Sequence, residues 1–404
     1  MPGGTGRFFQ RMAACSHPGE LVEELASFLQ VPVILADPGM ATVAASPPGT
    51  APPGRPLELP AGAQSLPPGE LMEGRLRRAA GEVPCLLARA AARNRTEGFL
   101  ILLNPGVMNE EQRDFVLAAA ALAGLMLARD RAGEEAARGA RSQFLYDLVY
   151  NNLESRGAMV ELGRLWGWDL TRPHGLVLLA LKDFDPLADR RLMQEAATRV
   201  ASLCGVSRPM LLVRGGQIVI ILPADGVEGK DAGKKLAGFA RRALDRLAGL
   251  FPGRNFTAGI GQTYPSPAEL FRSFQEAKLA VELGPVRDPE GQVHLFHELG
   301  VIRLIHDLQA DRLEEFYRDM LDPLLRYDRE NGTDLIPTLH RYFLCGGQLR
   351  EAARQMYLHP NTLRYRLKKV EELLKVSLDD LETCLNLFTA LKAGALLEHR
   401  EREG

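Results

Sequence analysis

The sequence lacks the features of a secreted, membrane-spanning or disulfide-rich protein. Its five cysteines are scattered and form no C-x-x-C pair, so neither a disulfide framework nor a zinc site is expected. The longest apolar run, residues 115–128, has 14 residues, too few for a helix that spans a membrane. The N-terminus has no apolar segment of the kind that a signal peptide needs. These absences predict a cytoplasmic protein.

The sequence also lacks the motifs of common enzyme classes. It contains no G-x-S-x-G nucleophile elbow, no Walker A loop and no H-E-x-x-H helix. His294 and His297 have the spacing of one helical face, but they lie at an expected strand-to-helix junction without a third ligand at a fixed spacing. We interpret them as surface histidines, and we expect no catalytic residue, no cofactor and no metal.

What is present suits a large globular protein. A chain of 404 residues is long enough for two to four domains with cores of their own. The content of 46% hydrophobic and 25% charged residues is ordinary for this class. The order of elements below predicts a multidomain α+β fold.

The stretch 335–376 contains three helical patterns in close succession. The first, Leu335 to Leu344, is stopped by Gly346-Gly347, a pair typical of a helix C-terminus. A short second helix is predicted from about Leu349 to Met356. Pro360 favours the first position of a third helix, which we expect to end near Leu374. Two short helices joined by a three-residue turn form a helix-turn-helix.

The third helix has an apolar side and a polar side. Leu363, Leu367, Val370 and Leu374 form one stripe that we expect to be buried. The helix would be roughly 22 Å long, enough to lie in a major groove of DNA. We expect the polar side and its flanks, with two arginines of the second helix, to contact DNA. These residues are His359, Asn361, Thr362, Arg364, Tyr365, Arg366, Lys368, Lys369, Arg350 and Arg354.

Charge supports this interpretation. The stretch 335–376 holds eight Lys or Arg and three Glu, a net charge of +5, whereas the whole chain carries −2. A basic segment on an otherwise acidic protein is typical of phosphate binding. The alternative is a solvated basic helix in an ordinary helical bundle.

The N-terminal region alternates between helix and strand. A helix is predicted over 19–30, a strand over 31–37, a strand pair at 84–89 and 97–103, and a helix from Asn109. Residues 47–69 contain eight Pro and four Gly in 23 positions, which predicts a flexible loop. This order resembles a small GAF-type sensor domain. A domain that serves only for oligomerisation is the alternative.

The helix that starts near Asn109 continues to about residue 154, which is long for a globular domain. Such helices connect domains or pair with a copy of themselves. We interpret it as a signalling and dimerisation helix. Alternatively, its apolar run 115–128 is the inner face of the sensor's closing helix.

The middle region follows the order of a nucleotide-cyclase palm. Strands are predicted at 174–182, 210–214, 217–222, 256–261 and 293–296, with helices at 157–166, 187–203, 231–249 and 267–283. The segments VRGGQIVIILP, 213–223, and TAGIGQ, 257–262, resemble the hairpin and the closing strand of a GGDEF domain.

The C-terminal stretch LREAARQMYLHPNTLRYRLKKVEELL, 349–374, resembles the DNA-binding domain of the PucR/CdaR family of bacterial regulators. That family has a degenerate GGDEF-like middle domain, so the two resemblances agree. Tyr357 departs from the general helix-turn-helix motif, in which Gly is common at the turn. A residue other than Gly with a positive φ is uncommon, so we expect this turn to be slightly opened or mildly strained.

The resemblance to GGDEF domains does not extend to their catalytic groups. A diguanylate cyclase needs carboxylates at the hairpin and the first strand to hold Mg²⁺. Gly215-Gly216 is followed here by Gln217 and Ile218, so the hairpin acids are missing. Asp183 and Asp185 follow the first strand, and we interpret them as caps of the next helix.

The sequence thus predicts a DNA-binding transcriptional regulator, by resemblance an activator, that responds to a small effector and binds double-stranded operator DNA as a homodimer. The alternatives are a nucleotide-binding or diguanylate-cyclase-type signalling enzyme and a dimeric scaffold without an effector. The expected domains are a GAF-like sensor at 1–130, a linker and dimerisation helix at 131–156, a degenerate GGDEF-like domain at 157–300, connecting helices at 301–330 and the helix-turn-helix domain at 331–404.

Overall fold

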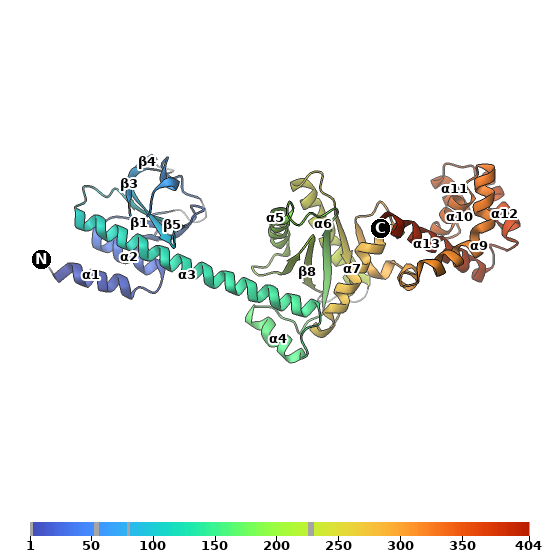
Figure 1. Ribbon diagram of the computed structural model, residues 1–404, viewed down its shortest axis with the longest axis horizontal. Coiled ribbons are helices and arrows are strands. Elements are labelled where there is room, and N and C mark those ends of the chain that lie inside the picture. The colour runs from blue at the N-terminus through green and yellow to red at the C-terminus, as the bar shows by residue number, and fades with distance from the viewer. Residues whose placement is uncertain (1–2, 52–55, 79–80, 225–229, 404) are drawn as a thin grey trace. The chain divides into compact units, whose positions relative to one another are not determined.

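The computed structural model describes residues 3–51, 56–78, 81–224 and 230–403 (Figure 1). The chain divides into two compact units, Met1–Ala140 and Arg141–Gly404. Both contain helices packed on an antiparallel or largely antiparallel sheet, which confirms the multidomain α+β prediction.

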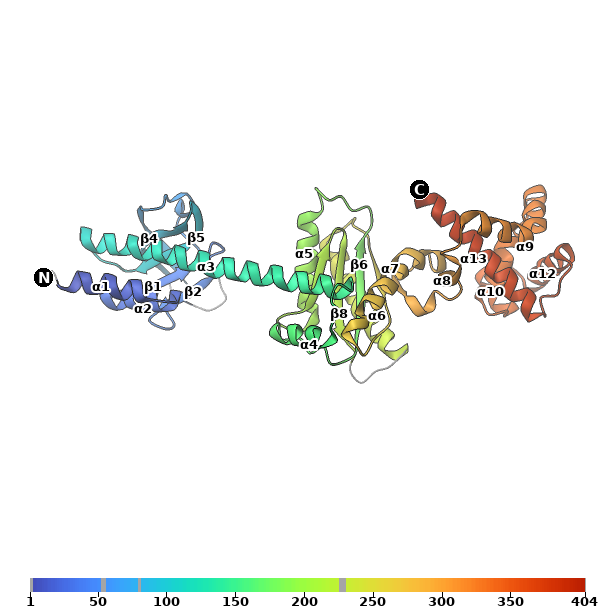
Figure 2. The same ribbon diagram turned by 60° about the horizontal axis from the view of Figure 1, so that its bottom comes forward.

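The N-terminal unit is a five-stranded antiparallel sheet in the order β2-β1-β5-β4-β3. Helices α2 and α3 cover one face, as Figure 2 shows. The sequence prediction missed α1, β2 and β3. The elements are α1 (Gly3–Ala14), α2 (Pro18–Leu29), β1 (Val33–Ala36), β2 (Thr42–Ser46), β3 (Leu71–Arg78), β4 (Gly81–Ala92), β5 (Arg95–Leu103) and α3 (Glu110–Val149).

Both faces of this sheet are buried. Alternate residues of β5 point to opposite faces: Leu100 and Leu102 join the helices, whereas Ile101 and Leu103 join a second apolar cluster. Ala51, Leu57, Ala63 and Leu66 cover that second face. These four residues come from the segment 47–69, so its described part is packed rather than a flexible loop. The composition did not reveal this because a few apolar residues among prolines are enough to cover a small face.

Helix α3 is 40 residues long and contributes to both units. Phe115, Val116 and Ala119 lie in the core of the N-terminal unit, so the apolar run is the inner face of a closing helix. Between residues 129 and 143 the helix is largely exposed. Its last turns, which include Phe144 and Leu148, belong to the core of the C-terminal unit.

The C-terminal unit begins with a second five-stranded sheet, in the order β10-β9-β6-β8-β7. Helices α5 and α6 pack on one face, and α7 and the end of α3 pack on the other. The predicted order of elements is confirmed throughout this part. The elements are α4 (Arg156–Leu165), β6 (His174–Leu181), α5 (Arg190–Ala201), β7 (Met210–Arg214), β8 (Gln217–Pro223), α6 (Lys230–Leu250), β9 (Phe256–Ile260), α7 (Leu270–Arg287) and β10 (Val293–Leu295).

The hairpin between β7 and β8 is a two-residue turn, as predicted. Arg214 pairs with Gln217, and Gly215 takes a φ of 54° that suits glycine. The Arg214 guanidinium lies over the rings of Tyr146 and Tyr150, at 4.6 and 5.3 Å from their centroids. The hairpin is thereby fixed to the C-terminal end of α3.

The interpretation of His294 as a surface residue is wrong. Its side chain is 2% exposed and packs against Gly284, where an added Cβ would lie 2.0 Å from the His294 Cγ. Burial lowers the pKa of His294, so the neutral ring is favoured. Among the described residues no group of three His, Cys, Asp or Glu is placed to hold a metal ion.

Six further α-helices follow in the part of the chain that the structure describes. Apolar residues of α7, α9 and α13, among them Leu283, Leu313 and Leu396, share one buried cluster. This cluster joins the sheet-containing part to the C-terminal helices. The helices are α8 (Ile302–Ile305), α9 (Ala310–Asn331), α10 (Leu335–Leu344), α11 (Leu349–Gln355), α12 (Pro360–Leu374) and α13 (Leu381–Glu403).

None of the helices in the described residues is long and apolar enough to cross a membrane.

Candidate nucleic-acid interface

Helices α10, α11 and α12 pack around one core. Their ends agree with the sequence prediction to within one residue. Leu363, Leu367 and Val370 of α12 pack against Ala352 and Ala353 of α11. Small residues on α11 let the two helices approach closely. Leu374, the last member of the predicted stripe, is partly buried.

The turn between α11 and α12 contains a left-handed residue, which fits the strained turn among the two expected alternatives. Tyr357 has a φ of 55°, and the Leu358 N–H donates to the Ala353 carbonyl at 2.9 Å. A tyrosine in this region of φ costs free energy relative to glycine. The Tyr357 side chain is 97% exposed. The sequence prediction assigned it a backbone role only, and its exposed ring next to α12 is a surface feature that periodicity does not reveal.

The start of α12 is fixed by its own cap. His359 is the N-cap residue, and its Nδ1 accepts a hydrogen bond from the Asn361 N–H at 3.2 Å. Pro360 occupies the first helical position, where it needs no hydrogen-bond partner. The side chain of His359 is therefore engaged at the helix terminus, and Thr362 beside it is exposed.

One face of α12 points to solvent. Asn361, Arg364, Tyr365 and Lys368 recur at helical spacing and are all exposed. The Arg364 Nη1 donates to the Asn361 Oδ1 at 2.9 Å, which holds the two side chains together. Tyr365 is 70% exposed. These four residues, called the α12 face below, can donate to and accept from base edges.

Arg366 and Lys369 are turned towards the rest of the domain. The Arg366 Nη1 donates to the buried Thr338 hydroxyl of α10 at 3.1 Å. The Lys369 ammonium lies 5.3 Å from the centroid of the Tyr327 ring on α9. Both side chains thus have intramolecular partners, and their predicted contact with DNA stays a prediction.

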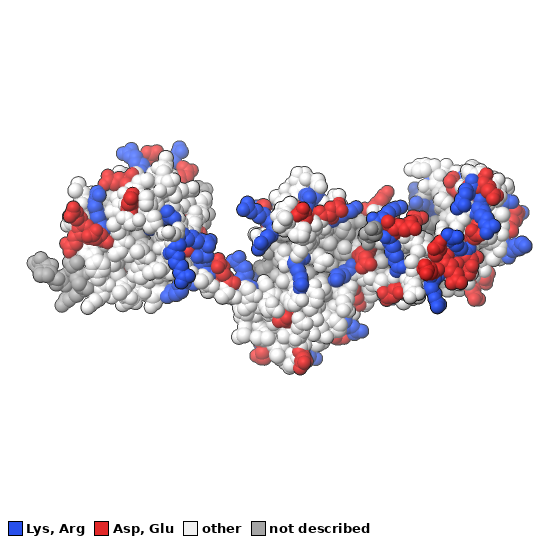
Figure 3. All heavy atoms as spheres, in the orientation of Figure 1, with Lys and Arg blue, Asp and Glu red and all other residues white. Residues whose placement is uncertain are grey.

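The two arginines of α11 differ from each other. Arg354 makes two hydrogen bonds to Glu351, at 3.0 and 2.7 Å, and these bonds lower the pKa of Glu351 to about 2. Arg350 is exposed. Figure 3 shows acidic side chains beside basic ones over the C-terminal helices.

One residue that positions this motif was missed by the sequence prediction. Asp328, on α9, accepts hydrogen bonds from the backbone N–H groups of Leu335 and Ile336 at 2.8 and 2.9 Å. Its carboxylate caps α10 from seven residues away. A search for a cap immediately before the helix selects Asp334 instead, whose side chain makes no capping bond.

Comparison with known proteins identifies two parts of the chain. Residues 335–393 match the model of the PucR C-terminal helix-turn-helix domain. Residues 151–283 match the model of a GGDEF-like domain. Both matches confirm the resemblances inferred from the sequence.

Several curated relatives are bacterial regulators. The purine catabolism regulatory protein of Bacillus subtilis is 32% identical over 144 residues, which are 36% of this chain and 27% of that protein. The proline-responsive transcriptional activator PutR of Bacillus subtilis is 29% identical over 33% of each chain. The carbohydrate diacid regulator of Escherichia coli is 24% identical over 62% of this chain and 66% of that one. The matches to the two Bacillus proteins thus span about a third or less of those relatives.

Two solved structures are also similar in part. A regulator of polyketide synthase expression from Bifidobacterium adolescentis matches 65% of this chain with 19% identity and a TM-score of 0.28. A GAF domain from an Acinetobacter phosphoenolpyruvate-protein phosphotransferase matches 32% of this chain with 14% identity and a TM-score of 0.25.

Proposed function

We propose that the chain, whose C-terminal domain matches the PucR helix-turn-helix model, is a sequence-specific DNA-binding transcriptional regulator of the PucR/CdaR type. The observation that carries the proposal is the α12 face. Asn361, Arg364, Tyr365 and Lys368 are exposed on a helix whose opposite side is buried. Arg bound to guanine and Asn bound to adenine are common base contacts in the major groove.

We assign the remaining predicted DNA contacts by their surroundings. Thr362, Arg350 and Arg354 are exposed around the α12 face and suit contacts to phosphate, which fix position rather than sequence. His359 caps the helix whose N-terminus would face the DNA. Arg366 and Lys369 hold α12 against α10 and α9.

The regulator is proposed to act in the cytoplasm as an effector-responsive activator. The N-terminal unit is the proposed sensor, and α3 is the proposed link, because its ends lie in the cores of the two units. We propose that the chain has five parts: a sensor at 1–130, a linking helix at 131–156, a GGDEF-like domain at 157–300, connecting helices at 301–330 and a DNA-binding domain at 331–404.

The enzyme alternative has little support. The GGDEF-like hairpin carries Gln217 and Ile218 in place of acids. The Asp185 carboxylate accepts hydrogen bonds from the Leu187 and Ala188 N–H groups, which lower its pKa and give it a structural role. We propose that this domain transmits a signal without catalysis.

A homodimer is proposed because one helix-turn-helix reads a short site, and two copies bound to successive turns of DNA gain affinity. Leu125 of α3 is 60% exposed on the helix proposed to pair. Leu125→Glu should therefore convert a dimer to a monomer in light scattering of the full-length protein. Leu187→Glu, at a 94% exposed leucine outside α3, is the matched control and should leave the mass unchanged. A wild-type monomer would contradict the proposal.

DNA binding is tested with sequences selected from a random DNA library by the full-length protein. Arg364→Ala should remove the preference for selected over scrambled DNA in a mobility-shift assay, because one bidentate base contact contributes about 1–3 kcal/mol of discrimination. Arg318→Ala, an exposed arginine on α9, should bind as the wild type does. Selection of no sequence, or an Arg364→Ala variant with unchanged preference, would overturn the assignment of α12.

A further inference from the structure

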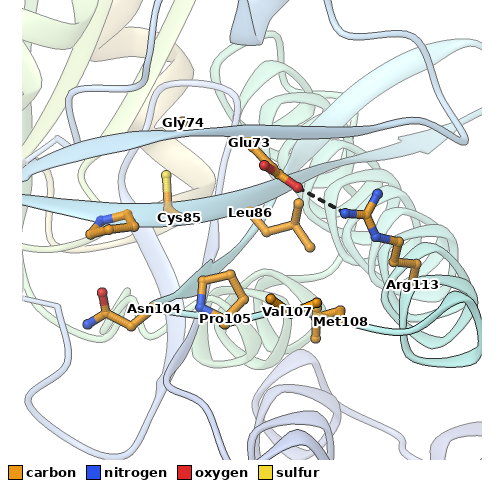
Figure 4. Close-up of a pocket in the computed structure, with 11 residues that line it drawn as sticks. Glu73, Gly74, Cys85, Leu86, Asn104, Pro105, Val107, Met108 and Arg113 are labelled. Carbon is orange, nitrogen blue, oxygen red and sulfur yellow. Dashed lines mark hydrogen bonds and ion pairs between the residues drawn. The ribbon is translucent and has the colours of Figure 1, made fainter.

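A cavity of about 540 Å³ lies in the N-terminal unit, where strands β3 and β4 meet the segment that leads into α3. Figure 4 shows Glu73, Cys85 and Leu86 on the strand side and Asn104 to Met108 on the other. Arg113, from the first turn of α3, closes one end. The cavity thus joins the sheet to the start of the helix that contributes to both units.

Two opposite charges line this cavity. The Arg113 Nη2 lies 2.9 Å from the Glu73 Oε1, and their side chains are 46% and 75% exposed. An ion pair that is this exposed contributes little to the stability of the fold. Either side chain can therefore exchange its partner for an oppositely charged group of a ligand at a small cost in stability.

The remaining lining combines apolar side chains with the exposed Asn104. Leu86, Pro105 and Met108 contribute to the walls, and Val107 projects fully exposed from the same segment. Covering an exposed valine with an apolar group is favourable, because apolar surface leaves water. Burial raises the pKa of the Cys85 thiol to about 11, so this cysteine contributes a neutral wall and no nucleophile.

We propose that this cavity binds a free α-amino acid with an apolar side chain. Its carboxylate would bind Arg113, its ammonium would bind Glu73, and its side chain would pack on Pro105, Val107 and Met108. A zwitterion replaces one exposed ion pair by two charge-assisted contacts, whereas a ligand with one charge leaves either Arg113 or Glu73 without its partner. The inference rests on the proposed function in one respect: the amino acid would be the effector.

The position of Arg113 gives such a ligand access to α3. The first turn of this helix is held by reciprocal bonds between Asn109 and Gln112, at 3.1 and 2.8 Å. A ligand that binds Arg113 in place of Glu73 breaks the ion pair between this first turn and β3. The same helix ends among the core residues of the C-terminal unit.

The test is calorimetric titration of the full-length protein with L-leucine, L-valine and L-methionine. For leucine, 4-methylpentanoic acid lacks the ammonium and 3-methylbutan-1-amine lacks the carboxylate. We expect at least one of the three amino acids to bind, and its one-charge analogues to bind about tenfold more weakly or not at all. Arg113→Gln and Glu73→Gln should each weaken binding by a similar factor. Arg75 lies on the same strand as Glu73, and its side chain forms an exposed ion pair with Glu82 of β4. Arg75→Gln is therefore the matched control and should bind the amino acid as the wild type does.

Three results would overturn the inference: no binding of any of the three amino acids, equal binding of the one-charge analogues, or unchanged binding by both cavity variants. Melting temperatures of the variants, expected within a few degrees of the wild type, distinguish lost binding from lost folding. Mobility shifts with selected DNA separate this inference from the proposed function. If the protein binds DNA but no amino acid, the proposed ligand site is rejected and the proposed function stands. If it binds an amino acid but no DNA, the proposed function is rejected and the ligand site stands.

Discussion

The guanidinium of Arg366 in α12 donates a hydrogen bond to the hydroxyl of Thr338, a fully buried residue of α10, at 3.1 Å. Two residues earlier, Arg364 bonds within α12, to the Asn361 side chain. Two arginines in the same helix therefore have different surroundings, and their substitutions should have different effects.

Arg366→Ala should lower the stability of the C-terminal helices by about 1 kcal/mol, because a hydrogen bond to a buried hydroxyl is lost. Arg364→Ala should leave stability within about 0.5 kcal/mol of the wild type, because its side chain is exposed. Urea unfolding of both variants measures the difference. Equal losses of stability would contradict the assignment of Arg366 to packing.

Glycine at position 357 should give a more stable protein than alanine. Tyr357 has a φ of 55°, a conformation that costs roughly 1–2 kcal/mol for any residue with a Cβ. Its ring is 97% exposed, so both replacements lose little packing. The Tyr357→Gly variant should exceed Tyr357→Ala by about 1 kcal/mol in urea unfolding. Should alanine prove equal to glycine, the turn carries no strain.

Arg131→Ala should destabilise the N-terminal unit. Its guanidinium donates two hydrogen bonds to the Glu97 carboxylate, at 2.8 and 2.7 Å, and the Glu97 side chain is 3% exposed. Removing the arginine leaves a buried charge unpaired. Glu97→Gln with Arg131→Ala should recover part of the loss, since no buried charge remains. A single variant as stable as the wild type, by calorimetry, would refute this account.

Acid should weaken the C-terminal helices through His340. Burial, Lys392 and Arg341 lower the pKa of His340 from 6.5 to about 4. The unfolded chain therefore takes up a proton at higher pH than the folded one, and stability falls as pH decreases from about 6.5 towards 4. His340→Gln should reduce this fall. Urea midpoints at pH 7.5 and pH 5 provide the comparison.

The GGDEF-like domain should form no cyclic dinucleotide from GTP and Mg²⁺. The hairpin has no carboxylate to hold the metal, and Asp185 is bound to backbone N–H groups. Chromatography of an incubation with the full-length protein checks this expectation. A product that disappears on Asp183→Asn or Asp185→Asn would establish catalysis.

The sequence predicted the elements whose residues carry strong local signals. Pro360 and the spacing of Leu363, Leu367 and Val370 located α12 with its observed bounds. Gly215-Gly216 between apolar runs located the β7–β8 hairpin. In both cases the signal lies within the element itself.

The misses depend on contacts between residues far apart in the chain. Strand β3 has the sequence LMEGRLRR, with Leu76 as its one fully buried residue, so its pairing with β4 is what makes it a strand. His294 is buried because Gly284 leaves room for its ring. Arg366 faces the domain because Thr338 of α10 accepts its hydrogen bond. The spacing of residues within α12 carries no information about where α10 lies.

The cluster shared by α7, α9 and α13 has a consequence for the order in which the chain folds. Leu283 and Val286 of α7 are buried in part by Ala393 and Leu396, residues made about 110 positions later. At ~5–20 residues per second, the ribosome completes that interval in roughly 5–20 s. Until then, a nascent or prematurely terminated chain displays an uncovered apolar patch on α7. A chain that stops before α13 should therefore be recognised by chaperones and proteases through this patch.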